Sequence, residues 1–359
     1  MNLDPSDEQR VFAAALRQFL DDADPLRELR DAEPADSPFD RKIWSRLANE
    51  IGLHGILLPQ AVGGSEGDLL DAVAAFEELG RSLLSGPYVA SLVQAPNLLA
   101  AAEAEQGAEW SAQLAQGELV VTVPFERTDV KMAGGGTSTG SVRVSGAVGP
   151  LPFAAEADLL LLVTTADELV AVPLGERPPI ETHVSIDPTQ RFGTVTLDNT
   201  PGVLLAHGVG VASAHDRALT QAATALAAEQ VGAAGKCLET AQAYAKERTQ
   251  FARPIGSFQA VKHLLVDVFI ELTFARRATW LAAWELENGV ESRLPRAAWS
   301  QAATTLQLAA TTSVQVHGGI AITWEHDAHW YLKRAVAFKA LFGSPAQHHD
   351  ALGGELVHG

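Results

Sequence analysis

Apolar residues recur at helical spacing along the first third of the chain. The pattern predicts helices over Ser6–Leu20, Trp44–Ile51, Asp68–Leu83 and Ser91–Ala102. On the first of them, one side carries Val11, Ala14, Leu16 and Leu20. The second ends at Gly52, a residue type that favours helix termination. We therefore expect an N-terminal helical domain over residues 1–117.

From about Gly117 the apolar residues come in short runs separated by Gly, Pro, Asp and Asn, a pattern typical of strands. The runs are Leu119–Val123, Ser141–Ser145, Leu159–Val163, Leu169–Val172 and Gly193–Leu197. They predict a small antiparallel β domain over residues 118–206.

The glycines Gly134–Gly136 fall inside this predicted β domain. Because neither Lys-Ser/Thr nor a helical pattern follows them, we interpret them as a hairpin loop and not a phosphate-binding loop.

The helical period returns near Ala212 and continues almost to the end of the chain. Long periodic segments cover Ala212–Lys246, Phe258–Asn288, Pro295–Val316 and His326–Ala340. Their lengths and short connections predict a four-helix bundle over residues 207–359. The fold class is therefore α+β, mostly helical, with a β domain between two helical domains.

Charge and composition exclude several classes of partner. The formal net charge of −18 argues against nucleic acid and against an anionic membrane surface, since both are bound through Lys and Arg. No uncharged apolar stretch approaches the length of a membrane span. A signal-peptide pattern is lacking, and the one cysteine, Cys237, fits a reducing compartment, so we expect a cytoplasmic protein.

The stretch from Arg248 to His263 gathers cations, rings and amides around the helix break Pro254–Gly256. Arg248 offers a planar set of donors suited to a diphosphate. The alternative is an ion pair with a nearby acid such as Glu247 or Asp267. A second polar group, Gln315–Gly319, ends a predicted helix with two glycines, whose backbone can approach phosphate oxygens or simply form a helix cap.

Other polar residues are given structural interpretations. The neighbours Glu77 and Glu78 diverge by about 100° on a helix, so we expect solvated surface charge and not an acid/base pair. His263 and His317 lack partners at metal-ligand spacing, and no metal site is predicted. The cluster His326, His329, His348 and His349 is expected to be exposed near the C-terminus.

Three strings of residues make the chain resemble the acyl-CoA dehydrogenase family of flavoproteins, over nearly its whole length. They are EELGRSL after LLPQAVGG, YAKERTQFARPIGSFQAVKHLLVD, and VQVHGGIAITWEHDAHWYLKRA. The second string matches the family pattern Arg-x-x-Phe-Gly-x-Pro-Ile-x-x-Phe-Gln except at Ala252, which replaces a glycine.

The resemblance implies the acyl-CoA dehydrogenase fold and an FAD cofactor. It implies that Arg248, Phe251 and Gln259 contact the FAD of a neighbouring subunit, and that Gln315, Val316, His317, Gly318 and Gly319 form a second flavin contact. In the family a carboxylate removes the α proton of an acyl-CoA thioester while hydride passes from the β carbon to flavin N5, so the chemistry requires a base.

The base expected from the resemblance is missing at both family positions. Gly343 and Ser344 stand where many members have a glutamate after the last bundle helix, and Ala222 stands near the alternative position on the first long helix. Glu229 lies about two turns from Ala222 and is a weak candidate base; Asp216 is weaker still.

The β domain departs from the family as well. Val123–Asp129 replaces the family's flavin-contacting Thr-Glu-Pro-x-Ala-Gly-Ser-Asp string, and no Trp-Ile-Thr/Ser segment follows near residues 146–157. The half of a flavin site that a subunit gives to its neighbour is present, whereas the half that it uses for its own flavin is degraded.

This combination is similar to the non-catalytic chain of actinobacterial heteromeric acyl-CoA dehydrogenases. The leading hypothesis is a subunit that completes the FAD site of a catalytic partner in an α2β2 heterotetramer acting on a bulky, steroid-type acyl-CoA, with electron-transfer flavoprotein as an implied acceptor. One alternative is a self-sufficient homotetrameric acyl-CoA dehydrogenase that uses Glu229. Another is a non-enzymatic assembly or regulatory homologue.

Overall fold

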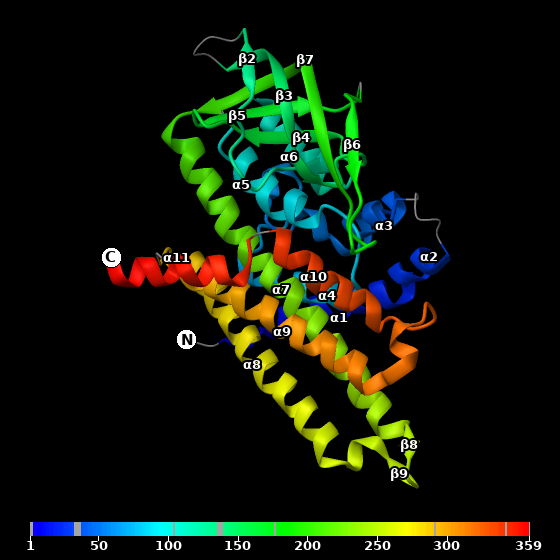
Figure 1. Ribbon diagram of the computed structural model, residues 1–359. Coiled ribbons are helices and arrows are strands. Elements are labelled where there is room, and N and C mark those ends of the chain that lie inside the picture. Colours follow the sequence, from blue (N-terminus) through cyan, green and yellow to red (C-terminus); the bar gives the residue numbers. More distant parts are fainter. Residues whose placement is uncertain are drawn as a thin grey trace.

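The chain folds into an N-terminal helical part, a β-sheet and a C-terminal helical bundle (Figure 1). The structure is a computed structural model that describes residues 3–31, 37–102, 105–134, 139–175, 177–290, 292–341 and 343–358. Gly135 and Gly136 of the expected hairpin loop lie outside these ranges. Gly134 follows β2 in the left-handed region, with φ of 85°.

The N-terminal part agrees with the predicted helices in most places. It contains α1 (Asp7–Ala23), α2 (Pro25–Asp31), α3 (Arg41–Arg46), α4 (Leu69–Ser82), α5 (Ala95–Leu99) and α6 (Glu105–Ala115). α3 continues as a π-helical turn over Leu47–Ile51 and ends at Gly52, whose φ is 74°. On α1 the buried residues are Leu16, Phe19 and Leu20, whereas Val11 is 70% exposed, contrary to the predicted apolar side.

The sheet contains seven strands in the described part of the chain, in the order β1-β4-β5-β7-β3-β2, with β6 beside β7. They are β1 (Val121–Thr122), β2 (Lys131–Ala133), β3 (Gly140–Pro152), β4 (Leu159–Val163), β5 (Glu168–Pro173), β6 (Ile180–His183) and β7 (Phe192–His207). The pairings are antiparallel as predicted, except that β1 lies parallel to β4. Every residue of β4 is buried, so helices or loops cover both faces of the sheet there.

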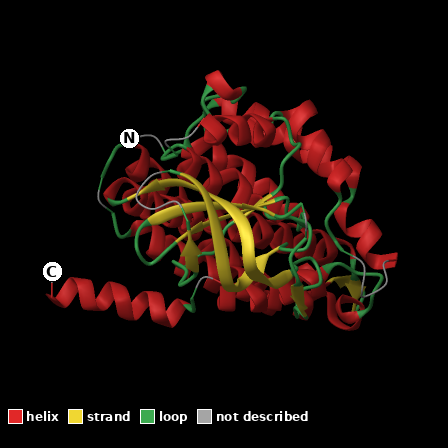
Figure 2. Cartoon of the chain, turned by 90° about the horizontal axis from the view of Figure 1, so that it is seen from above, coloured by secondary structure: helices red, strands yellow, loops and turns green. Residues whose placement is uncertain are grey.

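The C-terminal part is built on α7 (Val209–Glu247), which is about 58 Å long at 1.5 Å per residue. The hairpin of β8 (Thr249–Gln250) and β9 (Arg253–Pro254) connects it to the rest of the bundle. The remaining helices are α8 (Gln259–Glu287), α9 (Leu294–His317), α10 (Ala328–Leu341) and α11 (Pro345–His358). The helices α7 to α10 form the predicted bundle. α11 was not predicted, and it projects away from the body in both views (Figures 1 and 2).

One hydrophobic core joins the N-terminal helices, the sheet and the first half of α7. Because this core crosses residues 117 and 206, packing does not define a boundary at either position, and the limits of the three domains stay predictions. The helices α4 and α7 approach each other closely at two glycines, where no side chain separates them. A Cβ at Gly80 would lie 1.8 Å from the carbonyl oxygen of Glu229, and a Cβ at Gly232 would lie 1.8 Å from that of Glu77.

Candidate functional site

The Arg248–His263 stretch lies at the end of the bundle that is opposite the β-sheet (Figure 1). α7 ends at Glu247, and the β8–β9 hairpin turns at Phe251 and Ala252, whose φ values are 52° and 61°. This two-residue turn needs left-handed backbone at both positions. Ala252 adopts the conformation for which the family uses glycine, at a cost of about 1 kcal/mol.

Three predicted flavin contacts at this end face solvent. Phe251 is 87% exposed, and Arg248 and Gln259 are exposed as well. Within the described residues Arg248 forms no ion pair with Glu247 or Asp267, so the alternative role considered from the sequence is not observed. The guanidinium and the ring are therefore available to a ligand or to another chain.

The second predicted group, Gln315–Gly319, lies at the same end of the bundle. Val316 packs with Ala241 and Ala245 of α7, and Ile255 of the Pro-Ile-Gly break packs against this cluster. Gly318 has φ of 66°. A Cβ at either Gly318 or Gly319 would meet no atom within 4 Å. The two glycines thus form an open surface beside the hairpin, and the structure brings the two strings together.

His317 does not face that surface with its side chain. It is 5% exposed, and its Nδ1 donates a hydrogen bond of 2.7 Å to the carbonyl oxygen of Ser313. Its ring packs against those of Tyr244 and His326, at centroid distances of 4.6 and 4.4 Å. Val316 is also buried, so only backbone groups of these two residues are near the open surface.

The histidines near the C-terminus do not form one exposed cluster, contrary to expectation. His329 is 9% exposed and packs against Trp324 and Trp330. His349 lies on α11, where its Nε2 is 2.7 Å from the hydroxyl of Ser300. In the described ranges no three side chains of His, Cys, Asp or Glu gather as metal ligands, and no helix there has the length and apolar character to span a bilayer.

Glu78 is buried, Glu77 is half-buried, and both are paired, so the prediction of solvated surface charge was wrong. The Glu77 carboxylate accepts hydrogen bonds from Arg276 and from the indole of Trp280, and burial raises its pKa. Glu78 forms a bidentate pair with Arg17, at 2.6 and 2.8 Å. Both carboxylates connect α4 to neighbouring helices, which is a structural role.

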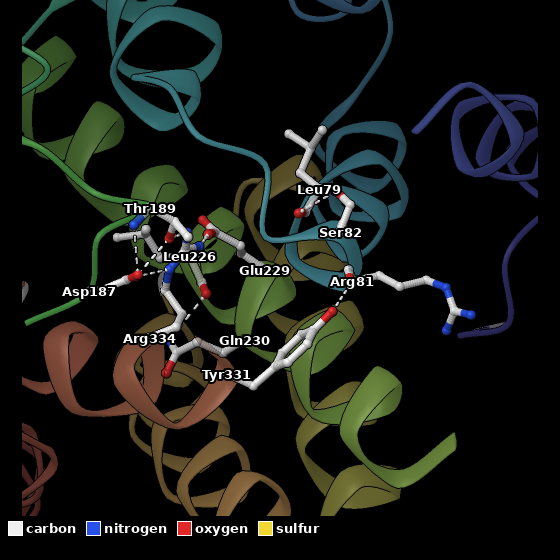
Figure 3. Close-up of polar contacts among 10 residues, drawn as sticks. All are labelled: Leu79, Arg81, Ser82, Asp187, Thr189, Leu226, Glu229, Gln230, Tyr331 and Arg334. Atoms are coloured by element: carbon white, nitrogen blue, oxygen red, sulfur yellow. Dashed lines mark hydrogen bonds and ion pairs between the residues drawn. The ribbon is translucent and has the colours of Figure 1, made fainter. Parts of the chain in front are cut away.

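The weak candidate base Glu229 belongs to a buried polar cluster around Arg334 (Figure 3). Arg334 of α10 is 1% exposed and donates to Glu229 of α7 and to Asp187 and Thr189 of the loop between β6 and β7. Burial raises the pKa of Glu229 to about 7, against the opposing effect of Arg334. One feature of the sequence indicates this cluster. Arg334 is four residues from Trp330 and four from Phe338, so it lies on the same side of α10 as these two buried rings.

The cavity beside Glu229 is too small for an acyl group. Its volume is about 30 Å³, which holds about one water molecule, whereas ligand pockets are typically about 300–1,000 Å³. Its lining includes Tyr88, Leu226 and Phe338. The other weak candidate, Asp216, has 74% of its side chain exposed and lies 3.7 Å from Arg127.

The two positions at which the family carries a base remain without one. Ala222 is fully buried on α7. Gly343 precedes α11, and its nearest side chain is that of His348. A wider surface hollow of about 680 Å³ adjoins Gly343, but Asp216 is the carboxylate that lines it among the described residues, and its exposure leaves it poorly suited to act as a base.

Models of known protein families match both helical parts of the chain. The family described as acyl-CoA dehydrogenase, N-terminal domain, matches residues 6–118, and acyl-CoA dehydrogenase, C-terminal domain, matches residues 208–353. The chain is similar to acyl-CoA dehydrogenase IpdE2 of Mycobacterium tuberculosis, with 33% identity over 319 residues, which covers 89% of this chain and 88% of that protein.

Two solved structures have the same fold over almost the whole chain. A chain of the ChsE4-ChsE5 complex from Mycobacterium tuberculosis gives a TM-score of 0.88 at 26% identity, covering 100% of both chains. A chain of a variant of the Tcur3481-Tcur3483 steroid ACAD gives a TM-score of 0.85 at 26% identity, covering 98% of each chain.

Proposed function

Since the chain belongs to the acyl-CoA dehydrogenase family of FAD-containing oxidoreductases acting on CH–CH bonds, we propose that it completes the flavin site of a second, catalytic chain. On this proposal the chain performs no chemistry in its own cavity. It contributes binding groups to a flavin whose ring, base and acyl-CoA site belong to the partner.

The observation that carries the proposal is the position of Arg248 and Phe251. Both side chains face solvent at the end of the bundle farthest from the chain's own sheet (Figure 1). A flavin held there cannot also lie against that sheet, so these groups serve another chain. We name this surface the cradle; it comprises Arg248, Phe251, Gln259, Gln315, Gly318 and Gly319.

The residues of the cradle fit the adenosine and diphosphate part of FAD. The guanidinium of Arg248 suits diphosphate oxygens, and the Phe251 ring and the Gln259 amide offer an apolar face and donors beside it. The open backbone at Gly318 and Gly319 permits close approach of phosphate or ribose. FAD, when bound, supplies the hydride acceptor of the reaction, whereas this chain supplies binding and orientation.

The chain's own half of a site does not fit a flavin and acyl-CoA. The cavity beside Glu229 is only about 30 Å³, Arg334 already donates to the Glu229 carboxylate, and neither Ala222 nor Gly343 is a base. The comparison structures ChsE4-ChsE5 and the Tcur3481-Tcur3483 steroid ACAD each pair two differently named chains. We infer an α2β2 heterotetramer, a bulky, steroid-type acyl-CoA, and electron-transfer flavoprotein as the acceptor.

The test measures flavin in the chain alone and in complex with a co-expressed catalytic chain. We expect little flavin in the isolated chain and one flavin for each pair of unlike chains in the complex. Arg248→Ala should lower the flavin content of the complex at least about tenfold at limiting flavin, because a bidentate charge-assisted contact is lost. Its control is Arg10→Ala, which alters an exposed arginine on α1.

Two results would contradict the proposal. Full flavin content and turnover of the isolated homo-oligomer would favour a self-sufficient acyl-CoA dehydrogenase. That alternative is supported by one observation, the pKa of Glu229 near 7, a value suited to a general base. Unchanged flavin content in the Arg248→Ala complex would instead leave an assembly or regulatory role.

A further inference from the structure

Three aromatic side chains pack together next to Gly318 of the cradle. They are Tyr244 in the last turn of α7, His317 at the last residue of α9, and His326 in the turn before α10. The rings of His317 and His326 are 4.4 Å apart between centroids and inclined by 55°. Because Gly318 directly follows His317, this packing holds the chain at the point where the open glycine surface begins. We name His317 and His326 the histidine pair.

Hydrogen bonds fix the neutral form of each ring in the histidine pair. Nδ1 of His317 donates to the carbonyl oxygen of Ser313 at 2.7 Å, so it carries the hydrogen and Nε2 is the basic nitrogen. Nδ1 of His326 accepts the backbone N–H of Ala328 at 3.1 Å, so the hydrogen of that ring is on Nε2. Each ring therefore has one basic nitrogen, at which an added proton has a defined place.

The charges around the histidine pair leave room for an added proton. Within the described residues neither ring forms an ion pair with an acid, and the neighbouring Asp327 is bound by Arg30 of α2 at 2.6 Å. Burial and the neighbouring His317 lower the pKa of His326, against the opposing effect of Asp327. His326 is thus largely uncharged near pH 7 until an anion is added. The other titratable or charged neighbours on the packed elements are Tyr244 of α7 and His329 and Lys333 of α10.

The diphosphate of FAD is the anion that would supply this charge. It is doubly charged, and a Cβ at Gly318 or Gly319 would meet no atom within 4 Å, so it can approach the backbone next to the pair. A nearby negative charge favours the charged form of a histidine. Arg248 stays protonated at every accessible pH and adds no pH dependence of its own. Within the cradle, a change of FAD affinity between about pH 6 and about pH 8 therefore reports a histidine.

We propose that the histidine pair takes up one proton when FAD binds in the cradle, which gives the cradle a second cation besides Arg248. This inference rests on the proposed function and extends it to the regulation of flavin binding. The proton comes from the solvent, and no bond within FAD forms or breaks. The pair acts through its charge, so its members are positioning residues and not contacts of the cofactor.

The direction of the pH dependence follows from this proton. The heteromer with FAD holds one proton more than the heteromer without it, so a lower pH favours the FAD-bound form. The effect operates between the pKa values that the pair has in the two states, and it disappears above the higher one. FAD should therefore bind at least about fivefold more tightly near pH 6 than near pH 8, within the limit of about tenfold per pH unit that one proton sets.

The test measures the dissociation constant of FAD at about pH 8 and about pH 6, using the heteromer with its catalytic chain freed of flavin and in excess. The variant is His317→Phe/His326→Asn. Phenylalanine keeps a ring against Tyr244, and asparagine keeps a side-chain oxygen that can accept the N–H of Ala328 two residues later. We expect the two dissociation constants of this variant to agree within about twofold.

A second measurement needs no variant and decides the matter if the double variant does not fold. Calorimetry of FAD binding to the wild-type heteromer, in two buffers of different ionisation enthalpy, gives the number of protons taken up. We expect more than about half a proton at the pH where the affinity changes most steeply.

The matched control is His263→Gln, which removes an exposed histidine near the start of α8, close to the cradle in sequence. It should keep the wild-type ratio of the two dissociation constants. Arg248→Ala should weaken FAD binding at both pH values and keep most of that ratio, because the arginine does not titrate in this range.

Three outcomes overturn the inference: equal FAD affinity of the wild type at the two pH values, a wild-type ratio in the double variant, and FAD binding without proton uptake. Each leaves the proposed function standing as long as Arg248→Ala lowers flavin content. If Arg248→Ala leaves flavin content unchanged, the proposed function fails instead, and that failure is seen at either pH.

Discussion

At the residue scale, we expect Glu229 not to act as a base, although burial raises its pKa to about 7. Its oxygen is already bound by Arg334, and the adjoining cavity holds about one water. Glu229→Gln should therefore leave turnover of the heteromeric complex within about twofold of wild type, since it removes no group that contacts substrate. The measurement is steady-state kinetics with an acyl-CoA substrate. Loss of turnover with flavin retained would restore Glu229 as the base.

His54 gives the clearest pH dependence at the residue scale. It is fully buried against Trp44, at a centroid distance of 4.2 Å, and burial lowers its pKa to about 3. The unfolded chain, with an ordinary histidine pKa near 6.5, binds a proton that the folded chain excludes. Stability is therefore lost as the pH falls below about 6.5.

The expected loss from this residue between pH 7 and pH 5 is about 2 kcal/mol. His54→Phe removes the titration, whatever its effect on absolute stability. Urea unfolding at the two pH values should show a smaller difference for the variant than for the wild type. Equal differences would mean that His54 is protonated in the folded chain.

At the scale of elements, the contact of α4 with α7 depends on glycine. A Cβ at Gly232 would lie 1.8 Å from the Glu77 carbonyl oxygen, so Gly232→Ala forces the two helices apart. We expect a loss of about 1–3 kcal/mol, as in other overpacked contacts, measured by thermal unfolding. In Gly235→Ala, on the same helix, the nearest atoms are 3.7 Å away or farther. Gly235→Ala should leave stability unchanged or raise it by up to about 1 kcal/mol. Equal losses of stability in Gly232→Ala and Gly235→Ala would contradict the claim that close packing at Gly232 requires glycine.

The periodicity of the sequence predicted most elements, because long helices with regular apolar spacing leave a strong signal. α7, α8 and α9 begin and end within three residues of the predicted limits. α2, α6 and α11 were not predicted. α2 lies in a stretch that was interpreted as a linker, and α6 and α11 contain few apolar residues and are interrupted by Gly107 and by Gly353–Gly354. The parallel pairing of β1 with β4 depends on chain topology, which local patterns do not contain.

The sequence could suggest a candidate site where its residues are close together along the chain, and the role of these residues as flavin contacts stays a prediction. Arg248, Phe251 and Gln259 were found in one string, and their exposure agrees with the predicted outward role. The Arg334 cluster was not predictable, because Arg334 and Asp187 are 147 residues apart and meet only in the folded chain. Glu77 and Glu78 were misjudged for the same reason: their partners come from α8 and α1.

At the scale of the whole molecule, Arg334 connects the loop after β6 to the bundle. It balances two buried acids, Asp187 and Glu229. Arg334→Gln should destabilise the chain by about 3–5 kcal/mol, because it leaves both carboxylates without their cation. Urea unfolding measures the effect.

The control for this prediction is the triple variant Asp187→Asn/Glu229→Gln/Arg334→Gln. It removes the two acids together with the arginine, so it should recover part of the stability lost in Arg334→Gln. A loss below about 1 kcal/mol in the single variant would show that the cluster contributes little to holding the sheet to the bundle.

The outward direction of the cradle has a consequence for how the cofactor is retained. On the proposed arrangement, flavin affinity and the affinity between unlike chains are thermodynamically linked, so each strengthens the other by the same factor. Mass action then makes cofactor occupancy depend on protein concentration: dilution separates the chains and releases FAD, and an excess of free FAD opposes the dilution. A cell that lowers the expression of this chain would thereby deplete its partner of cofactor without altering the partner's sequence.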